Sequence, residues 1–496
     1  MTKNQTIILI IFIAYLVLNA IIGLLFSKKQ NDASSLSHEK KFFIGGRSMN
    51  GLVLAMTTMA TYTSISSFIS GPGAAGATYG YAQVWIAAVQ VPVTFLVLGV
   101  LGNKLALVSR QTGAVTIVGY LNARYKSEAL VIVISLLSVV FCTAQMIGQF
   151  TGGATLISAI TGLPYGWALL IFGVVVIIYT AFGGFSAVAI TDTFQGFIMC
   201  IGTFLLLFYV LKTGGGLSGI DAGLKQNLPG VYDNMFALYS PGALASFWIL
   251  VGFGTLGLPQ TAVRGMGFKD TKSLKSAMII GCITCSFIMV GMHLAGCWAG
   301  GLPNRASIPT SDYFIPTIVQ QIMPVGVAGI FLAAPMAAVM STADSLLILV
   351  SAAIIKDLWK TFFVKDNPER LAGYNRHMKA GSALITLAFG VFVMLLALDP
   401  PNIIFFLNLF AFGGLECSFL WPLVGGLFWK KGTKEAALTS SIGAVATYIF
   451  CYYNVKVAGI NAVVWGLLAG GILYFAVGAF TSAKRTPDPE ILDNCF

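Results

Sequence analysis

Apolar runs, each about 20 residues long, follow one another along nearly the whole chain. The first, IILIIFIAYLVLNAIIGLLF, has no charged residue and no small-residue cleavage site, so we interpret it as a membrane span and not as a signal peptide. A helix needs about 20 apolar residues to cross a bilayer, where every backbone polar group must be satisfied within the protein. The runs therefore predict an all-α integral membrane protein.

We predict about thirteen transmembrane helices from these runs. Only 9% of the residues are charged and 57% are hydrophobic, whereas soluble domains carry about 25% charged residues, so no separate soluble domain is expected. The predicted spans are 6–27, 49–79, 81–103, 129–155, 164–183, 188–211, 243–263, 276–299, 315–355, 380–398, 402–429, 436–453 and 461–482.

Basic residues fall mostly on one side of this topology. With the N-terminus outside, 24 of the 29 Lys and Arg residues lie in inner loops and tails, as the positive-inside rule describes. This predicts a multi-pass protein of the inner (plasma) membrane with an outer N-terminus and a cytoplasmic C-terminus. The net charge of +11 thus orients the chain in the lipid bilayer and does not indicate a nucleic-acid partner. No obligate protein partner is evident.

The sequence offers none of the usual signs of an enzyme. The eight cysteines lie mostly inside spans without ligand or disulfide spacing, and the three histidines are scattered. No nucleophile–base pair or metal cluster is recognisable, and no catalytic domain is appended. We therefore expect a transporter without catalytic residues.

Two predicted spans contain residues that interrupt helices. The second span, 49–79, has a cluster of Ser, Thr and Tyr residues followed by Gly71-Pro72-Gly73. The seventh, 243–263, includes the stretch FWILVGFGTLGLPQTAV, with several glycines and a proline. These residues favour broken helices, although glycine and proline can also serve close helix packing.

The two interrupted spans are five spans apart. In transporters built from two inverted five-span repeats, the first helix of each repeat is broken near the bilayer midplane and exposes backbone groups to a cation and a solute. We therefore predict such repeats in spans 2–6 and 7–11. Residues 49–430 would form the transporter core, 1–48 the first helix with an inner loop, and 431–496 two accessory helices with a cytoplasmic tail.

Hydroxyls and a carboxylate crowd one face of the ninth span. Ser341, Asp344 and Ser345 project together because residues three and four apart share a helix face, and Thr342 adjoins them. Such hard oxygen ligands suit a small cation. The alternatives are a proton relay through the carboxylate and, for the hydroxyls, hydrogen bonds to their own helix.

Acids well inside the predicted spans are scarce, namely Asp192, Asp344 and Glu416. We expect no Lys or Arg deep in a span to neutralise them, and we place Arg264 at the inner end of its span. A bound cation would remove the cost of burying a carboxylate in an apolar setting. For Glu416 we favour a structural role in a helix break over a role in a pocket.

These stretches resemble the sodium:solute symporter family and, within it, the sodium/pantothenate symporters. The supporting segments are GGRSMNGLVLAMTTMATYTSISSFISGPGAA, YTAFGGFSAVAITDTFQG, GLPQTAVRGMGFKD, GMHLAG, FLAAPMAAVMSTADSLL and NLFAFGGLECSFLWPLVGGLFW. The resemblance implies a LeuT-type, five-plus-five inverted-repeat fold. It also implies import of a small organic anion, most similar to pantothenate, by alternating access with sodium as the cotransported ion. The alternative is proton coupling, or another solute such as an amino acid, monocarboxylate, sugar or sialic acid.

The resemblance also implies two ion sites. The family's common sodium site uses backbone oxygens of the broken second span and oxygens of the ninth, which here correspond to Ala60, Thr63, Ala338, Ser341 and Thr342. Some members carry a second sodium site, which here corresponds to Asp192, Asp344 and Ser345, sharing Ser341.

The substrate pocket implied by the resemblance is rich in amides and hydroxyls. Its residues would be Tyr62, Ser64, Ser67, Gln83, Gln90, Gln145, Gln149 and Thr255. Pantothenate has one carboxylate, two hydroxyls and an amide, which such a pocket suits. With no buried Arg or Lys expected, helix ends and polar side chains would hold the carboxylate. For each glutamine, a plain interhelical hydrogen bond is the alternative.

Overall fold

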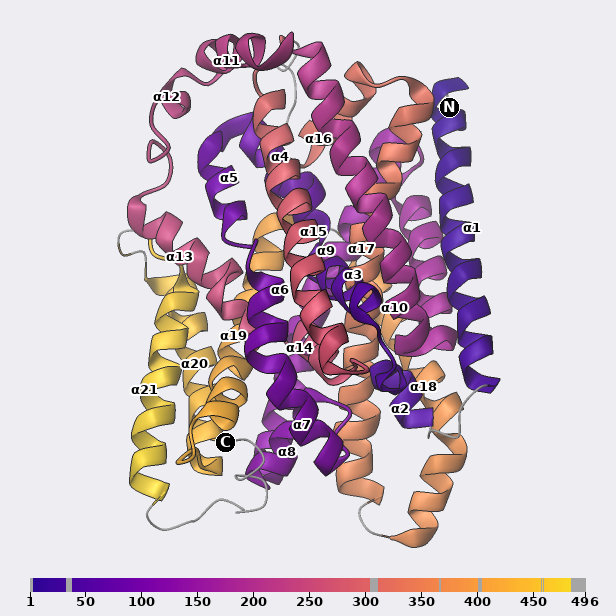
Figure 1. Ribbon diagram of the computed structural model, residues 1–496, viewed down its shortest axis with the longest axis vertical. Helices are drawn as coiled ribbons and strands as arrows, with labels where there is room; N and C mark the ends of the chain where they lie inside the picture. The colour runs from indigo at the N-terminus through magenta and orange to yellow at the C-terminus, as the bar shows by residue number, and fades with distance from the viewer. Residues whose placement is uncertain are drawn as a thin grey trace.

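The computed structural model (Figure 1) describes residues 3–32, 38–303, 311–364, 367–399, 404–455, 457 and 459–482. Its α-helices are α1 Lys3–Asp32, α2 His38–Ile44, α3 Gly51–Tyr62, α4 Gly71–Ala74, α5 Tyr81–Ala88, α6 Val93–Phe95, α7 Asn103–Thr112, α8 Ile117–Tyr125, α9 Glu128–Thr161, α10 Tyr165–Thr213, α11 Gly216–Asn227, α12 Pro229–Tyr232, α13 Pro241–Val251, α14 Pro259–Ala262, α15 Thr271–Ala299, α16 Ser311–Ile322, α17 Val325–Ala352, α18 Pro368–Leu396, α19 Ile404–Phe428, α20 Lys434–Asn454 and α21 Ala462–Ser482. Tighter or wider helical turns cover Gly45–Arg47, Ser66–Ser70, Ala75–Tyr79, Leu96–Gly102, Phe253–Gly257, Val263–Met266 and Ala353–Val364.

Within the described ranges, ten helices are long and apolar enough to cross a bilayer, and two bent helix pairs raise the number to twelve. The remaining predicted span is explained by α10, which contains both 164–183 and 188–211. A straight helix of its 49 residues would be about 73 Å long, more than twice the hydrocarbon thickness of a bilayer. Gly184 breaks α10 with φ 63° and ψ −173°, a conformation that glycine tolerates. Packing against Phe42 of α2 places this turn at the lower end of Figure 1.

The predicted ninth span, 315–355, differs from the structure at its start. Its first residues belong to α16, which ends at Ile322, and Pro324 then precedes a new helix, α17. Proline lacks the N–H that a continuing helix needs, and it fits well at a helix start. α17 is almost completely buried and lies at the centre of the bundle, where it packs against α9, α10 and α3.

Both spans predicted to be interrupted are indeed broken. α3 and the helical segment Ser66–Tyr79 meet at 74°, and the segments Pro241–Gly257 and Pro259–Met266 meet at 50°. The first break lies at residues 63–65, before Gly71-Pro72-Gly73. Those glycines instead allow close packing, because a Cβ on Gly73 would collide with the backbone of α16 and one on Gly71 with a side chain of α15.

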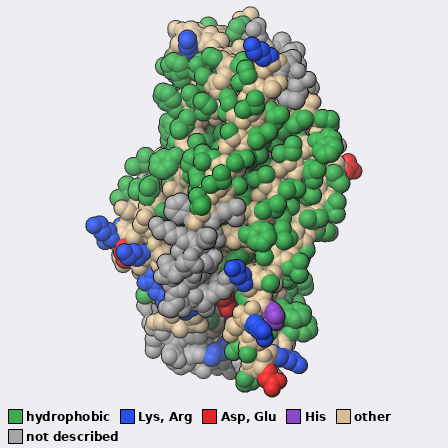
Figure 2. Space-filling view, turned by 90° about the vertical axis from the view of Figure 1, so that its right-hand side faces the viewer, with side chains coloured by type: hydrophobic (Ala, Val, Ile, Leu, Met, Phe, Trp, Pro, Cys, Tyr) green, Lys and Arg blue, Asp and Glu red, His purple; other side chains and the backbone are tan. Residues whose placement is uncertain are grey.

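The two ends of the bundle differ in charge. α1 begins at the upper end of Figure 1, whereas α2, α7 and α8 lie at the lower end. In Figure 2 hydrophobic side chains cover much of the upper and middle part of the visible face, and most Lys and Arg side chains on that face lie in its lower half. The α20–α21 hairpin packs at one edge against α19.

Candidate functional site

The break in the second predicted span exposes backbone oxygens inside the protein. α3 ends at Tyr62, and Thr63 takes an extended conformation (φ −73°, ψ 121°), so the chain leaves the helix axis there. The last carbonyls of a helix lack N–H partners within that helix. Ala60 and Thr63, which bracket this end, are completely buried.

Two hydroxyls of α17 point at these backbone oxygens. Ser341 Oγ lies 2.8 Å from Ala60 O, and Thr342 Oγ1 lies 2.9 Å from Thr63 O. Both hydroxyls are also close to Ala338 O, at 3.2 and 3.0 Å. The structure therefore brings together all five residues predicted for the first sodium site. They form a buried set of uncharged oxygen ligands, which is the kind of site that a hard monovalent cation prefers.

Asp192, on the second half of α10, packs against α3 beside this break. Its Oδ2 accepts a hydrogen bond from Thr57 Oγ1 at 2.5 Å, and Thr61 Oγ1 is 3.5 Å away. Arg264 Nη2 lies 3.2 Å from the same oxygen. Oδ1 has no hydrogen-bond partner in the described part of the chain.

The position of Arg264 corrects the prediction that no Lys or Arg lies deep in a span. Its side chain is 1% exposed, and its guanidinium also donates to the backbone of Thr57 and Gln260 and to Ser345 Oγ. The physical reason is the bend after α13. A straight span would carry residue 264 toward the membrane boundary, whereas the 50° bend turns it against α3. Arg264 therefore neutralises Asp192, and it does not line the solute pocket described below.

Asp344 accepts a hydrogen bond from a helix that the sequence did not indicate. Tyr179, on the first half of α10, donates its hydroxyl to Asp344 Oδ2 at 2.6 Å. Ser345 Oγ lies 3.2 Å from Asp344 Oδ1 and 2.8 Å from Arg264 Nη2. Asp192, Asp344, Ser341 and Ser345 thus lie in one buried cluster, as predicted for the second sodium site, but a guanidinium shares it.

The formal charges in this cluster do not cancel. Asp192 and Asp344 contribute two negative charges when ionised, and Arg264 contributes one positive charge. All three side chains are at most 1% exposed. One negative charge is left over, and burying it without a partner is unfavourable. A single monovalent cation would neutralise the cluster.

A narrow cavity of about 40 Å³ lies beside the same break. Its walls come from both sides of the α3 break and from α5, α13, α15 and α19, and the lining residues are Tyr62, Ser64, Ser66, Ser67, Gln83, Ile86, Gln90, Phe247, Val251, His293, Asn408, Leu409 and Phe412. Five of the eight predicted substrate residues are among them, namely Tyr62, Ser64, Ser67, Gln83 and Gln90. No Asp, Glu, Lys or Arg is among these lining residues.

The other three predicted substrate residues, Gln145, Gln149 and Thr255, are not among the residues that line this cavity. Gln149 accepts from the backbone N–H of Ile65 at 3.2 Å and donates to Asn408 at 3.3 Å. Gln145 accepts from Gln260 at 3.4 Å, and Thr255 bonds its own helix at Gly252. For the two glutamines, the structure shows the interhelical hydrogen bonds that were the alternative.

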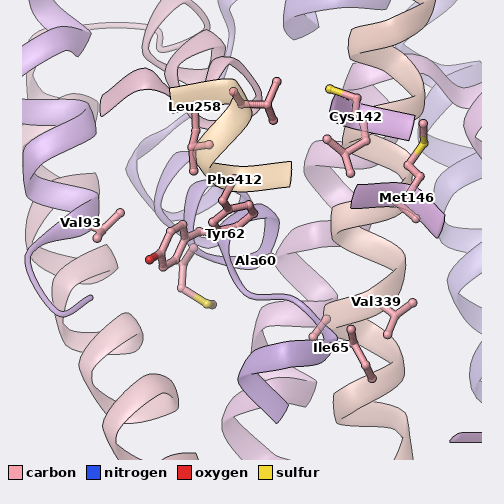
Figure 3. Packing of buried hydrophobic residues seen from close by; sticks show 14 of the residues in the cluster. Ala60, Tyr62, Ile65, Val93, Cys142, Met146, Leu258, Val339 and Phe412 are labelled. Atoms are coloured by element: carbon pink, nitrogen blue, oxygen red, sulfur yellow. The ribbon is translucent and has the colours of Figure 1, made fainter. Parts of the chain in front are cut away.

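The sequence analysis missed several pocket residues on α15 and α19. Asn408 and Phe412 are four residues apart and therefore share one face of α19. In Figure 3 the Phe412 ring lies next to that of Tyr62, and their centroids are 6.4 Å apart. His293 of α15 closes another wall. The sequence signal for α19 is the segment NLFAFGGLECS, in which Glu416 stands out as a buried acid whereas Asn408 and Phe412 do not stand out.

Comparison with known proteins agrees with this architecture. A model described as the Sodium:solute symporter family matches residues 42–444. The chain is 43% identical to a sodium/pantothenate symporter of Escherichia coli (strain K12) over 472 residues, 94% of this chain and 95% of that protein. The corresponding protein of Haemophilus influenzae is also 43% identical, over 91% of this chain and 92% of its own length.

Two further similarities concern more distant proteins. The osmoregulated proline transporter OpuE of Bacillus subtilis (strain 168) is 27% identical over 94% of this chain and 93% of its own. A solved structure of a Na⁺-coupled sialic acid symporter, in a substrate-bound outward-open state, superposes with a TM-score of 0.81 at 20% identity, covering 97% of this chain and 98% of the other.

Proposed function

The chain belongs to the sodium:solute symporter family and is thus a sodium-coupled transporter and not an enzyme, and we propose that its solute is pantothenate. The sodium ion is cotransported substrate. What supports the choice of solute is the combination of two relatives named for pantothenate at 43% identity with an uncharged pocket rich in hydroxyls and amides.

Sodium binds where α17 meets the end of α3. The observation that carries this assignment is the approach of Ser341 Oγ and Thr342 Oγ1 to Ala60 O and Thr63 O, at 2.8 and 2.9 Å. When a cation enters, the hydroxyls turn their lone pairs toward it, and carbonyl oxygens complete the coordination. Because the bound ion joins α17 to both sides of the break, it also fixes the shape of the adjoining pocket.

Pantothenate binds in the cavity between the broken α3 segment and α19. Its hydroxyls and amide match Gln83, Gln90 and Ser67, which can donate and accept hydrogen bonds. Its carboxylate is held by polar side chains and by the positive end of the dipole at the start of the helical segment that follows the break. The cavity of about 40 Å³ is smaller than this solute, so the pocket must widen to admit it.

The second sodium site is formed by Asp192, Asp344 and Ser345, together with Ser341. The leftover negative charge of this cluster supports it, because one monovalent cation would cancel that charge. Arg264 then acts as a fixed cation beside a mobile one. Two sodium ions carried with one monoanion move one net positive charge per cycle.

Transport proceeds by alternating access, and the protein keeps one orientation in the membrane. The end that carries α2, α7 and α8 faces the cytoplasm, in accordance with its excess of Lys and Arg, and α1 begins outside the plasma membrane. Residues 49–430 form the moving core, with 1–48 and 431–496 as additions. Rocking of one helix bundle against the other exposes the central site to each side in turn.

Reconstitution into liposomes tests this function. Labelled pantothenate should accumulate under an inward sodium gradient and should not do so when choline replaces sodium at the same pH. Proline is the comparison solute, because more distant relatives are named as proline transporters. Sodium-driven accumulation of proline in place of pantothenate would contradict the solute assignment, and equal uptake in choline would contradict the coupling.

A further inference from the structure

Glu416 is the one acid of the three predicted inside spans that no interaction explains. Its side chain is completely buried in α19. Neither carboxyl oxygen has a hydrogen-bond partner within the described part of the chain. The predicted structural role would require such partners, because an ionised carboxylate in an apolar setting is costly unless it is compensated.

The carboxyl group of Glu416 faces the break in the second discontinuous helix. A Cβ on Gly254 would collide with Glu416 Oε2, and a Cβ on Gly257 would lie 3.0 Å from the Glu416 backbone. Both glycines belong to the turn between α13 and α14. The absence of side chains there lets α19 pack directly on the unwound backbone, with the acid pointing into the break.

Glu416 also continues the pocket-lining face of α19. Asn408 and Phe412 line the cavity, and Glu416 follows Phe412 by four residues, so all three share one face. Phe412 and Tyr62 lie side by side (Figure 3), both line the cavity, and Phe412 is one helical turn from Glu416. Moving these two rings apart would open Glu416 to water in the pocket.

The predicted inverted repeat gives this position a counterpart. Asp192 lies on the last span of the first repeat and packs against the broken helix of that repeat, at Thr57. Glu416 lies on the last span of the second repeat and packs against the broken helix of its own repeat, at Gly254. Asp192 is neutralised by Arg264, whereas Glu416 has no cation beside it among the described residues.

Within the described ranges, the titratable groups found to face Glu416 are neutral near pH 7 in their ordinary state. They are Tyr62 of α3, Tyr448 of α20 and the neighbouring Cys417. The turn Phe253–Gly257 carries none. On α8, which also packs against α19, Arg124 bonds the far end of that helix at Gly426. None of these described groups favours an ionised carboxylate at Glu416.

We propose that Glu416 is a proton-binding site of the solute pocket, which must be in its neutral form for the pocket to close on an anionic solute. While the pocket is open, the carboxylate takes a proton from a hydronium ion, which leaves as water. Closure of Tyr62 and Phe412 then removes water and keeps the acid neutral. By linkage, solute binding draws in a proton, and raising the pH weakens solute binding. This inference rests on the proposed function.

Calorimetry of the purified full-length protein tests the proton directly. Pantothenate is titrated at saturating sodium in two buffers with different heats of ionisation, and the difference gives the protons taken up per solute bound. We expect a positive value, at most one, for the wild type and none for Glu416→Gln, which cannot titrate. Glu369→Gln is the matched control, because Glu369 is an exposed acid in the first turn of α18.

Uptake into proteoliposomes supplies the second readout. At saturating sodium, wild-type uptake should fall about tenfold per pH unit once Glu416 is mostly ionised, whereas Glu416→Gln should change less than about twofold over the same range. Sodium activation should be the same in both.

Each other result overturns the inference. Wild-type binding heats that are independent of the buffer exclude the proton, even if Glu416→Gln fails to fold. If Glu416→Gln keeps the wild-type pH profile, Glu416 has a structural role. If Glu416→Gln loses sodium cooperativity, Glu416 is a sodium ligand. If wild-type protein shows no sodium-dependent pantothenate uptake, the proposed function fails as well, so the two failures are told apart by the wild-type measurements alone.

Discussion

Arg264 Nη2 and Asp192 Oδ2 lie 3.2 Å apart at the centre of the molecule, and both side chains are withdrawn from solvent. The pair joins the second broken helix to the second half of α10. Arg264 also donates to the backbone of Thr57 on the first broken helix, so one guanidinium ties together both discontinuous helices. Its five donors make this network specific in geometry, which lysine could not reproduce.

Substitution of one member of this ion pair should lower the free energy of unfolding more than substitution of both members. We expect Arg264→Met alone to lower the free energy of unfolding by about 3–5 kcal/mol, because it leaves a buried carboxylate unpaired. Adding Asp192→Asn should recover part of that loss. Thermal unfolding of the purified variants in detergent measures both effects. Strictly additive losses would show that the two residues do not depend on each other.

The hydroxyls at the α3 break should control the response to sodium. We expect Ser341→Ala and Thr342→Ala each to raise the sodium concentration for half-maximal uptake by about five- to thirtyfold, which corresponds to about 1–2 kcal/mol for one lost ligand. The solute requirement at saturating sodium should change far less. Ser351→Ala is the control, because it removes a buried hydroxyl of α17 that bonds Leu347 and Thr386 instead. Unchanged sodium dependence in both test variants would show that these two hydroxyls do not bind the transported sodium ion.

Much of this fold could be predicted from the sequence, because membrane spans are set by length and hydropathy. The two broken spans were also predictable from their glycines and prolines. The location of the first break was not, because it depends on Thr63 taking an extended conformation, which nothing in its local sequence requires. The hairpin in α10 depends on a single left-handed glycine, Gly184, within a continuous apolar stretch.

The site could be predicted where one helix carries the information, and not where tertiary packing does. The hydroxyls of α17 follow from spacing along one helix. Asp344 bonds Tyr179, and Arg264 bonds Asp192, and in each pair the two residues are more than 70 positions apart in the sequence. The bend that buries Arg264 has no signature in hydropathy. Asn408 and Phe412 enter the pocket for the same reason, since only packing shows which face of α19 points at Tyr62.

Substitution of a residue that lines the cavity should change the pantothenate concentration for half-maximal uptake more than substitution of a neighbour that only bonds between helices. We expect Gln83→Ala to raise the pantothenate concentration for half-maximal uptake by about tenfold, which is the loss of one or two hydrogen bonds, with sodium dependence unchanged. Gln145→Ala should affect it less than about threefold, because Gln145 bonds Gln260 and does not line the cavity. Equal effects of the two substitutions would show that the cavity is not the solute site.

Glu39 should stabilise the contact between α2 and the helical segment Ala353–Val364 in a pH-dependent way. It lies 2.7 Å from Lys356 and 2.8 Å from Lys360. Burial alone would raise the pKa of Glu39, but the two lysines outweigh this and hold that pKa below its ordinary value of 4.5. A lowered pKa means that the stabilisation is complete above about pH 4.5 and is lost as the pH falls through the lowered value.

Glu39→Gln should therefore lower the unfolding temperature at neutral pH, by an amount equivalent to about 1 kcal/mol for a partly exposed pair. The difference from the wild type should disappear under strongly acidic conditions, where Glu39 is protonated in both states. Detergent-solubilised protein followed by intrinsic fluorescence over a pH series gives this comparison. A difference that persists at acidic pH would assign the effect to packing instead of charge.

Asp344 should set the charge moved per solute. With both sodium sites filled, two sodium ions and one monoanion carry one net positive charge, so a potential of 100 mV adds about 2.3 kcal/mol to the driving force. Asp344→Asn removes the unpaired negative charge of the buried cluster, so the electrostatic attraction that binds the second sodium ion is lost. We expect uptake of labelled pantothenate to persist at high sodium while the charge moved per solute falls by one elementary charge and sodium cooperativity is lost. Tyr179→Phe is the control, because it removes the hydroxyl that bonds Asp344 but keeps the acid, and it should remain electrogenic. A wild-type current per solute in Asp344→Asn would mean that the charge of Asp344 is not coupled to a transported ion.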